Sequence, residues 1–410
     1  MAAPTPQLSV KEVLRELPVR RIWIAQMVSV FGDFLALFAI FAIVTFQLHG
    51  TPTQVSMIMV AFLLPLAVIS PLAGVFVDKW NVKATMITSD VIRGLLVLTL
   101  IFVRDLNVIY ATFFLLATVS AFFIPAQSVA VRTLAPANGL LSVNALMTQA
   151  VQGIMIISPG IAGLLVDGVG ANACFIFDSI SFFVSAGLVA SLTIRREAAP
   201  ASTEARSVLQ SLGQGFQFIF THAAISFVMI AMTAGMFAVR CFGALLSVYV
   251  RDVLVSNAKL FGLLNSLIGI GMILGSQVIR KFAQKTTHQL IVIYGLAGMG
   301  VSVLITAIFG MVASTAAGML GLGFCVAFIM ITAQTLIQRE TPAPMLGRVS
   351  SSLMSLLAIA QVLAMLVAGP VAQFSGIRNL YFGSAAMLFA MALLGYTRIR
   401  RSEPAAAAAA

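Results

Sequence analysis

The sequence has few charged residues, cysteines or histidines, and each shortage excludes a class of protein. Only 9% of its 410 residues are charged, against about 25% in soluble domains, which excludes a soluble fold. No histidine or second cysteine neighbours any of the three cysteines, so we expect them to be buried packing residues and expect no metal site. The histidines are solitary and lie near the ends of apolar runs, so we expect them at the membrane interface. These six residues are Cys174, Cys241, Cys325, His49, His222 and His288.

Motifs of catalysis and nucleotide binding are also missing. The sequence has no phosphate-binding glycine loop, no nucleophile elbow and no H-E-x-x-H pattern. We therefore expect neither an enzyme nor an ATP-driven pump, and no cofactor. Any driving force must come from an ion gradient or from the substrate's own gradient.

Long apolar runs are what the sequence has in abundance, since 60% of the residues are hydrophobic. A helix needs about 20 apolar residues to cross a bilayer, and runs of this length predict an all-α protein with twelve transmembrane helices. The predicted spans are 22–47, 54–77, 84–103, 107–131, 143–166, 172–194, 217–249, 260–280, 288–310, 312–337, 349–373 and 379–397.

The net charge of +11 by itself suggests a nucleic-acid partner, but the positions of the charges argue against one. Most of the 24 basic residues fall in loops that lie on one side of the membrane if the N-terminus is cytoplasmic, as the positive-inside rule requires. We therefore expect both termini in the cytoplasm and the protein in the inner or plasma membrane. The predicted outer loops hold only Arg104, Arg251, Lys259 and Arg378.

The spans divide the chain into two bundles of six helices. Residues 1–21 form an amphipathic cytoplasmic segment, and residues 195–216 read as a mobile linker because they contain Pro200 and several small or polar residues. The bundles then comprise 22–194 and 217–398. We expect 399–410 to be a cytoplasmic tail, and its run from Ala405 to Ala410 is given no function.

The two halves share a pattern that indicates an internal repeat. In the first half, the stretch 121–127 ends in Gln127 and leads to Pro136 and Pro159; in the second, 327–334 ends in Gln334 and leads to Pro342 and Pro370. The same order at similar spacing, in the same membrane orientation, implies duplication of a six-helix unit. Parallel repeats of this kind place a substrate path between the halves.

A loop motif after the second span resembles that of the major facilitator superfamily, G-x-x-x-D-[RK]-x-G-[RK]-[RK]. Gly74, Asp78, Lys79 and Lys83 match it, whereas Asn81 replaces the second glycine and Val82 replaces one basic residue. Further stretches are similar to the branch that contains the enterobactin exporter, the macrolide efflux proteins and, more distantly, the lysophospholipid transporter. These stretches are 31–33, 89–94, 123–126, 137–146 and 158–163.

The last of these stretches resembles the helix-5 element G-P-x-x-G that is associated with antiporters. Pro159 and Gly163 match this element, and Ser158 replaces its first glycine. The resemblance implies the major facilitator fold of two six-helix repeats, and it suggests proton antiport. It also implies that Asp78, Lys79, Lys83, Asp90, Arg93 and Arg132, together with Gly74, form a cytoplasmic cluster that controls the conformation. A cluster that only fixes topology is the alternative.

Five charged residues fall inside predicted spans, where a charge needs a partner or a water-lined cavity. Asp33 lies about 18 Å along the first span from Arg21, near its middle, and is our candidate for proton coupling. A structural ion pair is the alternative for Asp33. Arg240, in the seventh span, can neutralise Asp33 or bind an anionic substrate group. Asp90 and Arg93 are three residues apart and can pair, and Asp178 is expected to make a structural hydrogen bond.

Polar and bend-forming residues inside the spans are candidates for lining the substrate path. The hypothesis that follows is a proton-coupled exporter of an amphipathic small molecule, drug-like or siderophore-like, working by alternating access as a monomer. The alternative is an uncoupled lysophospholipid flippase in which Arg240 meets the phosphate. The candidate lining residues are Gln26, Phe123, Pro125, Gln127 and Gln334.

Overall fold

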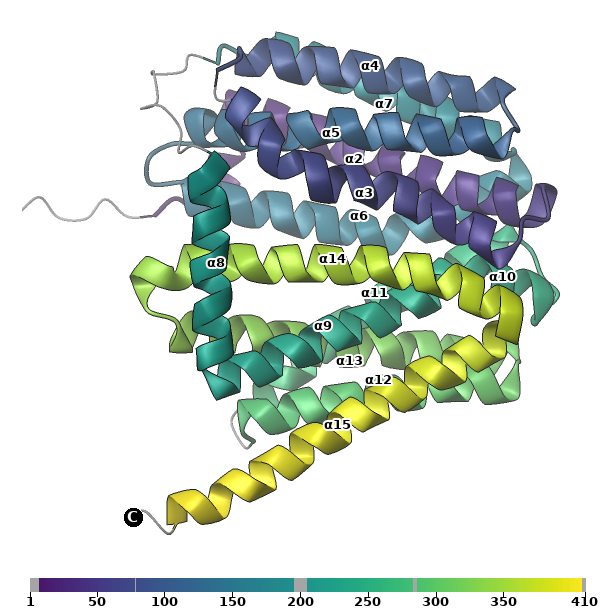
Figure 1. The fold of residues 1–410 in the computed structure, drawn as a ribbon. Helices are drawn as coiled ribbons and strands as arrows, with labels where there is room; N and C mark the ends of the chain where they lie inside the picture. The colour runs from purple at the N-terminus through teal and green to yellow at the C-terminus, as the bar shows by residue number, and fades with distance from the viewer. Residues whose placement is uncertain (1–6, 78, 195–204, 283–285, 408–410) are drawn as a thin grey trace, which may run out of the picture. The chain divides into compact units, whose positions relative to one another are not determined.

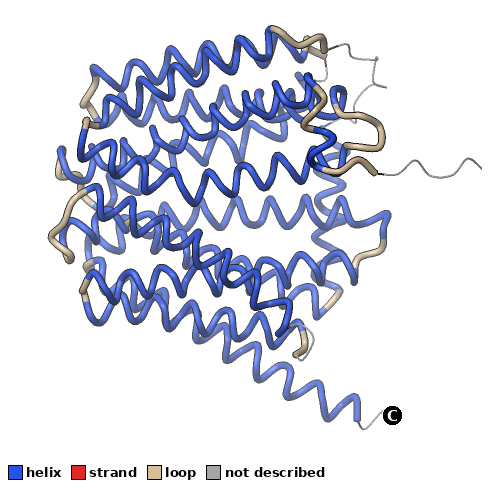
Figure 2. Tube along the Cα trace, turned by 180° about the vertical axis from the view of Figure 1, so that it is seen from behind, coloured by secondary structure: helices blue, strands red, loops and turns tan. Residues whose placement is uncertain are grey.

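The computed structural model describes residues 7–77, 79–194, 205–282 and 286–407. Within these ranges the chain consists of helices joined by short connections and contains no strand (Figure 2). Among the described helices, 12 have the length and hydropathy that crossing a membrane requires, so the predicted number of spans is confirmed. The protein is an all-α, multi-pass membrane protein.

The helices group into two compact units, each described by itself. Unit 1 comprises Met1–Leu48 and Ala61–Ala205, and unit 2 comprises His49–Val60 and Arg206–Ala410. The helices and the π-helical turn η1 of the first half are α1 (Val10–Val13), α2 (Leu17–Ala42), η1 (Ile43–Gln47), α3 (Pro52–Val77), α4 (Val82–Phe102), α5 (Leu106–Leu134), α6 (Leu140–Gly168) and α7 (Ala171–Ala190). Those of the second half are α8 (Ala205–Thr221), α9 (Ala223–Ala244), α10 (Leu246–Asp252), α11 (Ala258–Phe282), α12 (His288–Phe309), α13 (Val312–Glu340), α14 (Ala343–Ser375) and α15 (Ile377–Ala407).

Four helix pairs of unit 1 have equivalents in unit 2. In unit 1, α2 packs on α6 and α7, and α4 packs on α5 and α7, with α4 and α7 side by side (Figure 1). In unit 2, α9 packs on α14 and α15, and α12 packs on α13 and α15. In each unit the first membrane helix packs on the fifth and sixth, and the third packs on the fourth and sixth. The duplication that the sequence predicted is therefore present at the level of packing.

The start of α3 groups with unit 2, whereas the sequence placed the whole span in the N-terminal bundle. Gly369 of α14 lets the two helices approach closely, because a Cβ at this position would lie 2.7 Å from the Cα of Thr53. The guanidinium of Arg251 also donates a hydrogen bond to the carbonyl of Gly50 at 2.8 Å. These contacts tie the first turns of α3 to helices of unit 2.

Part of the segment predicted to be a mobile linker is helical. Residues 195–204 lie outside the described residues, but α8 covers 205–221 and crosses α14 (Figure 1). Its apolar residues recur every three to four positions, which is the period of an amphipathic helix and which the linker interpretation overlooked. The crossing occurs at Gly215, where an added Cβ would lie 2.9 Å from the carbonyl carbon of Arg348.

The N-terminal segment is docked against unit 1. Ser9 and Glu12 form a capping box at the start of α1, and Val13 is fully buried in a core cluster that also contains Ile22 and Phe123. The amide of Leu8 donates to the carbonyl of Asn138 at 3.1 Å. The segment therefore closes the apolar core of unit 1 at the end where α5 and α6 are joined.

Candidate functional site

Four of the five charged residues predicted inside the membrane meet in unit 1. Asp33 lies on α2, Asp90 and Arg93 lie on α4, and Asp178 lies on α7. Because α2 and α4 both pack against α7, three helices bring these side chains to one region. We call Asp33, Asp90, Asp178 and Arg93 the carboxyl cluster.

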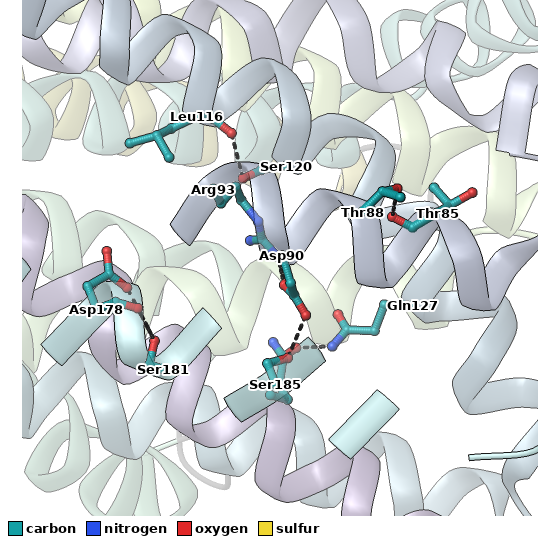
Figure 3. A network of polar contacts seen from close by, with 11 residues as sticks. Thr85, Thr88, Asp90, Arg93, Leu116, Ser120, Gln127, Asp178, Ser181 and Ser185 are labelled. Atoms are coloured by element: carbon teal, nitrogen blue, oxygen red, sulfur yellow. Dashed lines mark hydrogen bonds and ion pairs between the residues drawn. The ribbon is translucent and has the colours of Figure 1, made fainter. Parts of the chain in front are cut away.

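Asp90 and Arg93 form a buried ion pair, as their spacing on the helix predicted. Arg93 Nη2 donates to Asp90 Oδ1, and the two side chains are 4% and 0% exposed. Ser185 of α7 donates from its Oγ to the other carboxylate oxygen of Asp90 at 2.7 Å (Figure 3). The Arg93 guanidinium lies between the rings of Phe123 and Phe182, with its Cζ 4.2 Å and 4.4 Å from their centroids. Two cation–π contacts thus add to the ion pair in stabilising the buried charge.

Asp178 is buried against α2, next to Asp33. Ser181 donates to the backbone carbonyl of Asp178 at 2.7 Å and lies 3.4 Å from its carboxylate Oδ1 (Figure 3). The close approach depends on Gly32, since a Cβ there would lie 2.9 Å from the Cα of Asp178. The expected structural hydrogen bond of Asp178 is present. The sequence did not reveal that the same carboxyl lies beside Asp33.

The carboxyl cluster carries more negative than positive groups. Three carboxyl groups, those of Asp33, Asp90 and Asp178, lie in the region of one guanidinium, that of Arg93. The Arg93 guanidinium donates to Asp90, whereas Asp33 makes no hydrogen bond with any described residue. Asp90 and Asp178 are buried and Asp33 is partly buried, so their charges are costly unless they are balanced.

A pocket of about 400 Å³ opens in unit 1 between α2, α5 and α6. Gln127 donates from its Nε2 to Gln26 Oε1, which joins α5 to α2 at the pocket wall. Arg132 is the one charged side chain among the lining residues. The lining is Gln26, Gln127, Ser128, Val131, Arg132, Leu140, Asn144 and Met147, and we call this space the Gln26 pocket.

The Gln26 pocket and the carboxyl cluster lie along shared helix faces. Gln26 and Asp33 are seven residues apart, so they lie on one face of α2, separated by roughly 10 Å along its axis. Phe123, which contacts Arg93, precedes Gln127 by four residues on α5. A molecule in the pocket would therefore lie about two helical turns from the carboxyl that we expect to exchange a proton.

Arg240 lies in unit 2, on α9, and Asp33 in unit 1, so their pairing stays a prediction. Arg240 is partly buried and makes no hydrogen bond or ion pair with any described residue. Gln334 is exposed on α13. The roles of Arg240 and Gln334 in substrate binding stay predictions.

The residues of the loop motif occupy the end of α3 and the start of α4. Asp78 lies outside the described residues, so the expected cluster of Asp78 with Arg132 stays a prediction. Within the described ranges Lys79, Lys83 and Arg132 form no ion pair. Gly74 is on α3, where an added Cβ would meet no atom within 4 Å.

The antiporter-like element lies inside α6. Ser158 is fully buried and its Oγ has no hydrogen-bond partner among the described residues, whereas Pro159 and Gly163 are buried beside it. Pro159 in α6 and Pro125 in α5 each lack an N–H and so interrupt the hydrogen bonding within their helix. These features mark positions where the two helices can bend.

Comparison with known proteins agrees with this architecture. The chain is 23% identical over 386 residues to the protein of Bacillus subtilis described as "Uncharacterized MFS-type transporter YfiS", with 90% of each chain covered. It is also 23% identical to macrolide efflux protein A of Streptococcus pyogenes, covering 91% of this chain and 94% of that one.

Among solved structures, an aspartate-to-alanine mutant of the nucleoside transporter NupG matches with a TM-score of 0.76 at 11% identity. The match covers 93% of this chain and 99% of that one, and at this identity it supports the fold alone. The sequence profile of the Major Facilitator Superfamily matches residues 22–365, which is most of the chain. Profile, helix number and repeated packing agree with one another, and the chain belongs to the Major Facilitator Superfamily, whose members are secondary transporters of small molecules.

Proposed function

We propose that the protein exports an amphipathic small molecule from the cytoplasm in exchange for protons. The observation that carries this proposal is the Gln26 pocket, which shares helix faces with the carboxyl cluster. Gln26 and Gln127 supply amide donors and acceptors, and Leu140 and Met147 supply an apolar wall. A lining of this kind suits a molecule with both polar and apolar parts. The similarity to macrolide efflux protein A supports the outward direction.

Proton coupling follows from the excess of carboxyl groups. If all three were ionised beside one guanidinium, two negative charges would remain uncompensated in the apolar interior. A proton on Asp33 removes one of them. Exchange results if Asp33 holds its proton in one conformation and releases it in the other, with substrate entering the Gln26 pocket only after release. Pro125 and Pro159 lie where α5 and α6 would bend during this change.

Transport by the purified protein in liposomes tests the coupling. A labelled macrolide and a panel of amphipathic dyes serve as probes, and movement of at least one of them should depend on an imposed pH gradient. Asp33→Asn should reduce the gradient-driven rate to that of empty liposomes. Glu340→Gln is the matched control, because Glu340 is an exposed carboxyl at the end of α13. Coupled rates in Asp33→Asn that equal those of the parent would refute the role of Asp33.

A lysophospholipid is the second candidate substrate, and one observation favours it. Arg240 has no acidic partner among the described residues, so its guanidinium is available to a phosphate group. A fluorescent lysophospholipid should then change leaflets in protein-containing vesicles without a pH gradient, and Arg240→Ala should stop it. Equal lipid movement in the parent and Arg240→Ala proteins would eliminate this role. Export of a small molecule, as a monomer in the inner or plasma membrane with both termini cytoplasmic, remains the primary proposal.

A further inference from the structure

A second cavity lies on unit 1, away from the Gln26 pocket, where α3 ends and α4 begins. Its volume is about 600 Å³, and its walls come from the connection between these helices, from α4 and from α5. The lining is Lys79, Trp80, Asn81, Ala84, Thr85, Thr88, Ser89, Ile92, Val119 and Phe122. We call this space the α4 groove.

The α4 groove changes from polar to apolar along its length. Lys79, Trp80 and Asn81 supply an ammonium, an indole N–H and a side-chain amide at one end, whereas Ile92 and Val119 line the groove farther along α4 and α5. Asn81 and Ile92 are roughly 16 Å apart along the axis of α4. That length accommodates a lipid headgroup and the upper part of one acyl chain.

The exposure of the walls indicates that the groove opens to the bilayer. Trp80 is 48% exposed and Ile92 is 46% exposed, and both belong to the lining. The Trp80 ring stacks on the Phe122 ring, with centroids 5.6 Å apart, so the indole is held in place at the mouth of the groove. Tryptophan is enriched at the level of the lipid headgroups, where its ring is apolar and its N–H is hydrated.

The charge of the lining selects the headgroup. Lys79 is the only charged side chain among the described lining residues, and Lys83 follows within one turn of α4. The side-chain oxygen of Asn81 caps the amide of Ala84 at 3.0 Å, which leaves its NH₂ group directed to other acceptors. Among the described lining residues, these donors and one positive charge fit a phosphodiester group.

We propose that the α4 groove binds an anionic phospholipid. The phosphate contacts the Lys79 ammonium and the Trp80 and Asn81 donors, and one acyl chain lies along Ile92 and Val119. The positive-inside rule places this end of unit 1 in the cytoplasmic leaflet. The site is separate from the Gln26 pocket and does not depend on what the protein transports.

Fluorescence of Trp80 tests the proposal directly. The chain has two tryptophans, and Trp23→Phe leaves Trp80 alone while removing an indole N–H that is buried without a described partner. This protein is placed in liposomes containing phospholipids brominated on the acyl chains, which quench nearby tryptophan. At equal mole fraction, brominated phosphatidylglycerol should quench Trp80 with an apparent association constant about fivefold that of brominated phosphatidylcholine.

Further variants separate the headgroup from the groove. Adding Lys79→Gln should bring the ratio of the two lipids close to one, whereas Lys281→Gln, an exposed lysine of unit 2, should leave it unchanged. Ala84→Leu fills the groove and should weaken quenching by both lipids. Equal quenching by the two lipids with Lys79 present, or an unchanged ratio in Lys79→Gln, would overturn the proposal. Relief of quenching by inorganic phosphate would also overturn it, because the site would then recognise a free anion.

Discussion

Arg93 shows how one buried charge is held inside a membrane helix bundle. It pairs with Asp90 on its own helix and stacks between Phe123 of α5 and Phe182 of α7, while its Nε has no described partner. Removing one member of a buried pair leaves the other charged and desolvated, which costs more than the pair itself contributes. Arg93 therefore connects three helices through one side chain.

Substitutions at this pair have a predictable order. Arg93→Ala should destabilise the protein by about 3–5 kcal/mol, because Asp90 is then buried without a countercharge. Combining Arg93→Met with Asp90→Asn removes both charges, keeps an acceptor for Ser185, and should restore most of the loss. Thermal unfolding in detergent measures both. A double variant as unstable as Arg93→Ala would show that the stacking on Phe123 and Phe182 matters more than charge balance.

At the scale of helices, small residues set how closely pairs approach. α11 and α13 meet at Gly271 and Gly323, where an added Cβ would lie 2.9 Å from the amide nitrogen of Phe324 and 2.9 Å from the Cα of Ile268, respectively. Such contacts are the usual basis of tight helix pairs in membranes, where no hydrophobic effect drives association. Gly32 plays the same part between α2 and α7.

A glycine in the α11–α13 contact and a glycine in open space should respond differently to substitution by alanine. Gly323→Ala should lower stability by about 1–3 kcal/mol, since backbone must move to admit the methyl group. Gly153→Ala in α6, where nothing lies within 4 Å of the added Cβ, should be neutral or raise stability by up to about 1 kcal/mol. Thermal unfolding of the two variants provides the comparison. Equal losses would mean that close packing at Gly323 is not what holds α11 to α13.

The docked N-terminal segment depends on the ionisation of Glu12. Hydrogen bonds from the backbone amide and hydroxyl of Ser9 hold the pKa of Glu12 below its usual value of 4.5. A carboxyl whose pKa is lowered by the capping box stabilises the capped segment above its usual pKa, and this contribution is lost as the pH falls through the lowered value. Docking should therefore weaken only in acid, as the pH falls below the usual value of 4.5.

Hydrogen exchange at Leu8, whose amide bonds to Asn138, reports this docking. At pH 7, Glu12→Gln should exchange severalfold faster than the parent, because an amide carbonyl replaces a charged acceptor. At a pH below the lowered pKa of Glu12, the exchange rates of the two proteins should approach each other. Glu16→Gln is the control, since the Glu16 side chain makes no capping hydrogen bond. A difference between Glu12→Gln and the parent that persists at low pH would exclude ionisation as its cause.

At the scale of the whole molecule, the distribution of basic residues predicts the orientation in the membrane. With the N-terminus cytoplasmic, the connection between α6 and α7 is outside and the one after α7 is inside. Cys174 and Cys241 are buried as expected, but Cys325 is only partly buried, so Cys325→Ala is the background in which added cysteines should dominate labelling. Val169→Cys should react with a membrane-impermeant maleimide on intact cells, and Thr193→Cys only after permeabilisation. The reverse result would invert the proposed topology and, with it, the leaflet of the α4 groove.

Much of the helical fold was predictable from single residues and their spacing. The apolar runs predicted twelve spans. The pairing of Asp90 with Arg93 was predictable because the two residues are three positions apart on one helix. The helix α8 was missed because Pro200 and its neighbours dominated the reading of the segment, although the following residues have helical periodicity. The link between the start of α3 and α14 was missed because it depends on a glycine at 369, far away in the sequence.

The sequence alone determined the number of spans, the repeat and the presence of charges inside the membrane, because hydropathy and helix period are local properties of the chain. Only the tertiary structure decided that Asp178 lies beside Asp33, that Arg93 stacks between two rings, and that Gln26 and Gln127 share a pocket. These contacts join residues up to about 150 positions apart. Their geometry depends on which helices pack together and on how each helix is rotated about its axis. The spacing of residues along the sequence determines neither.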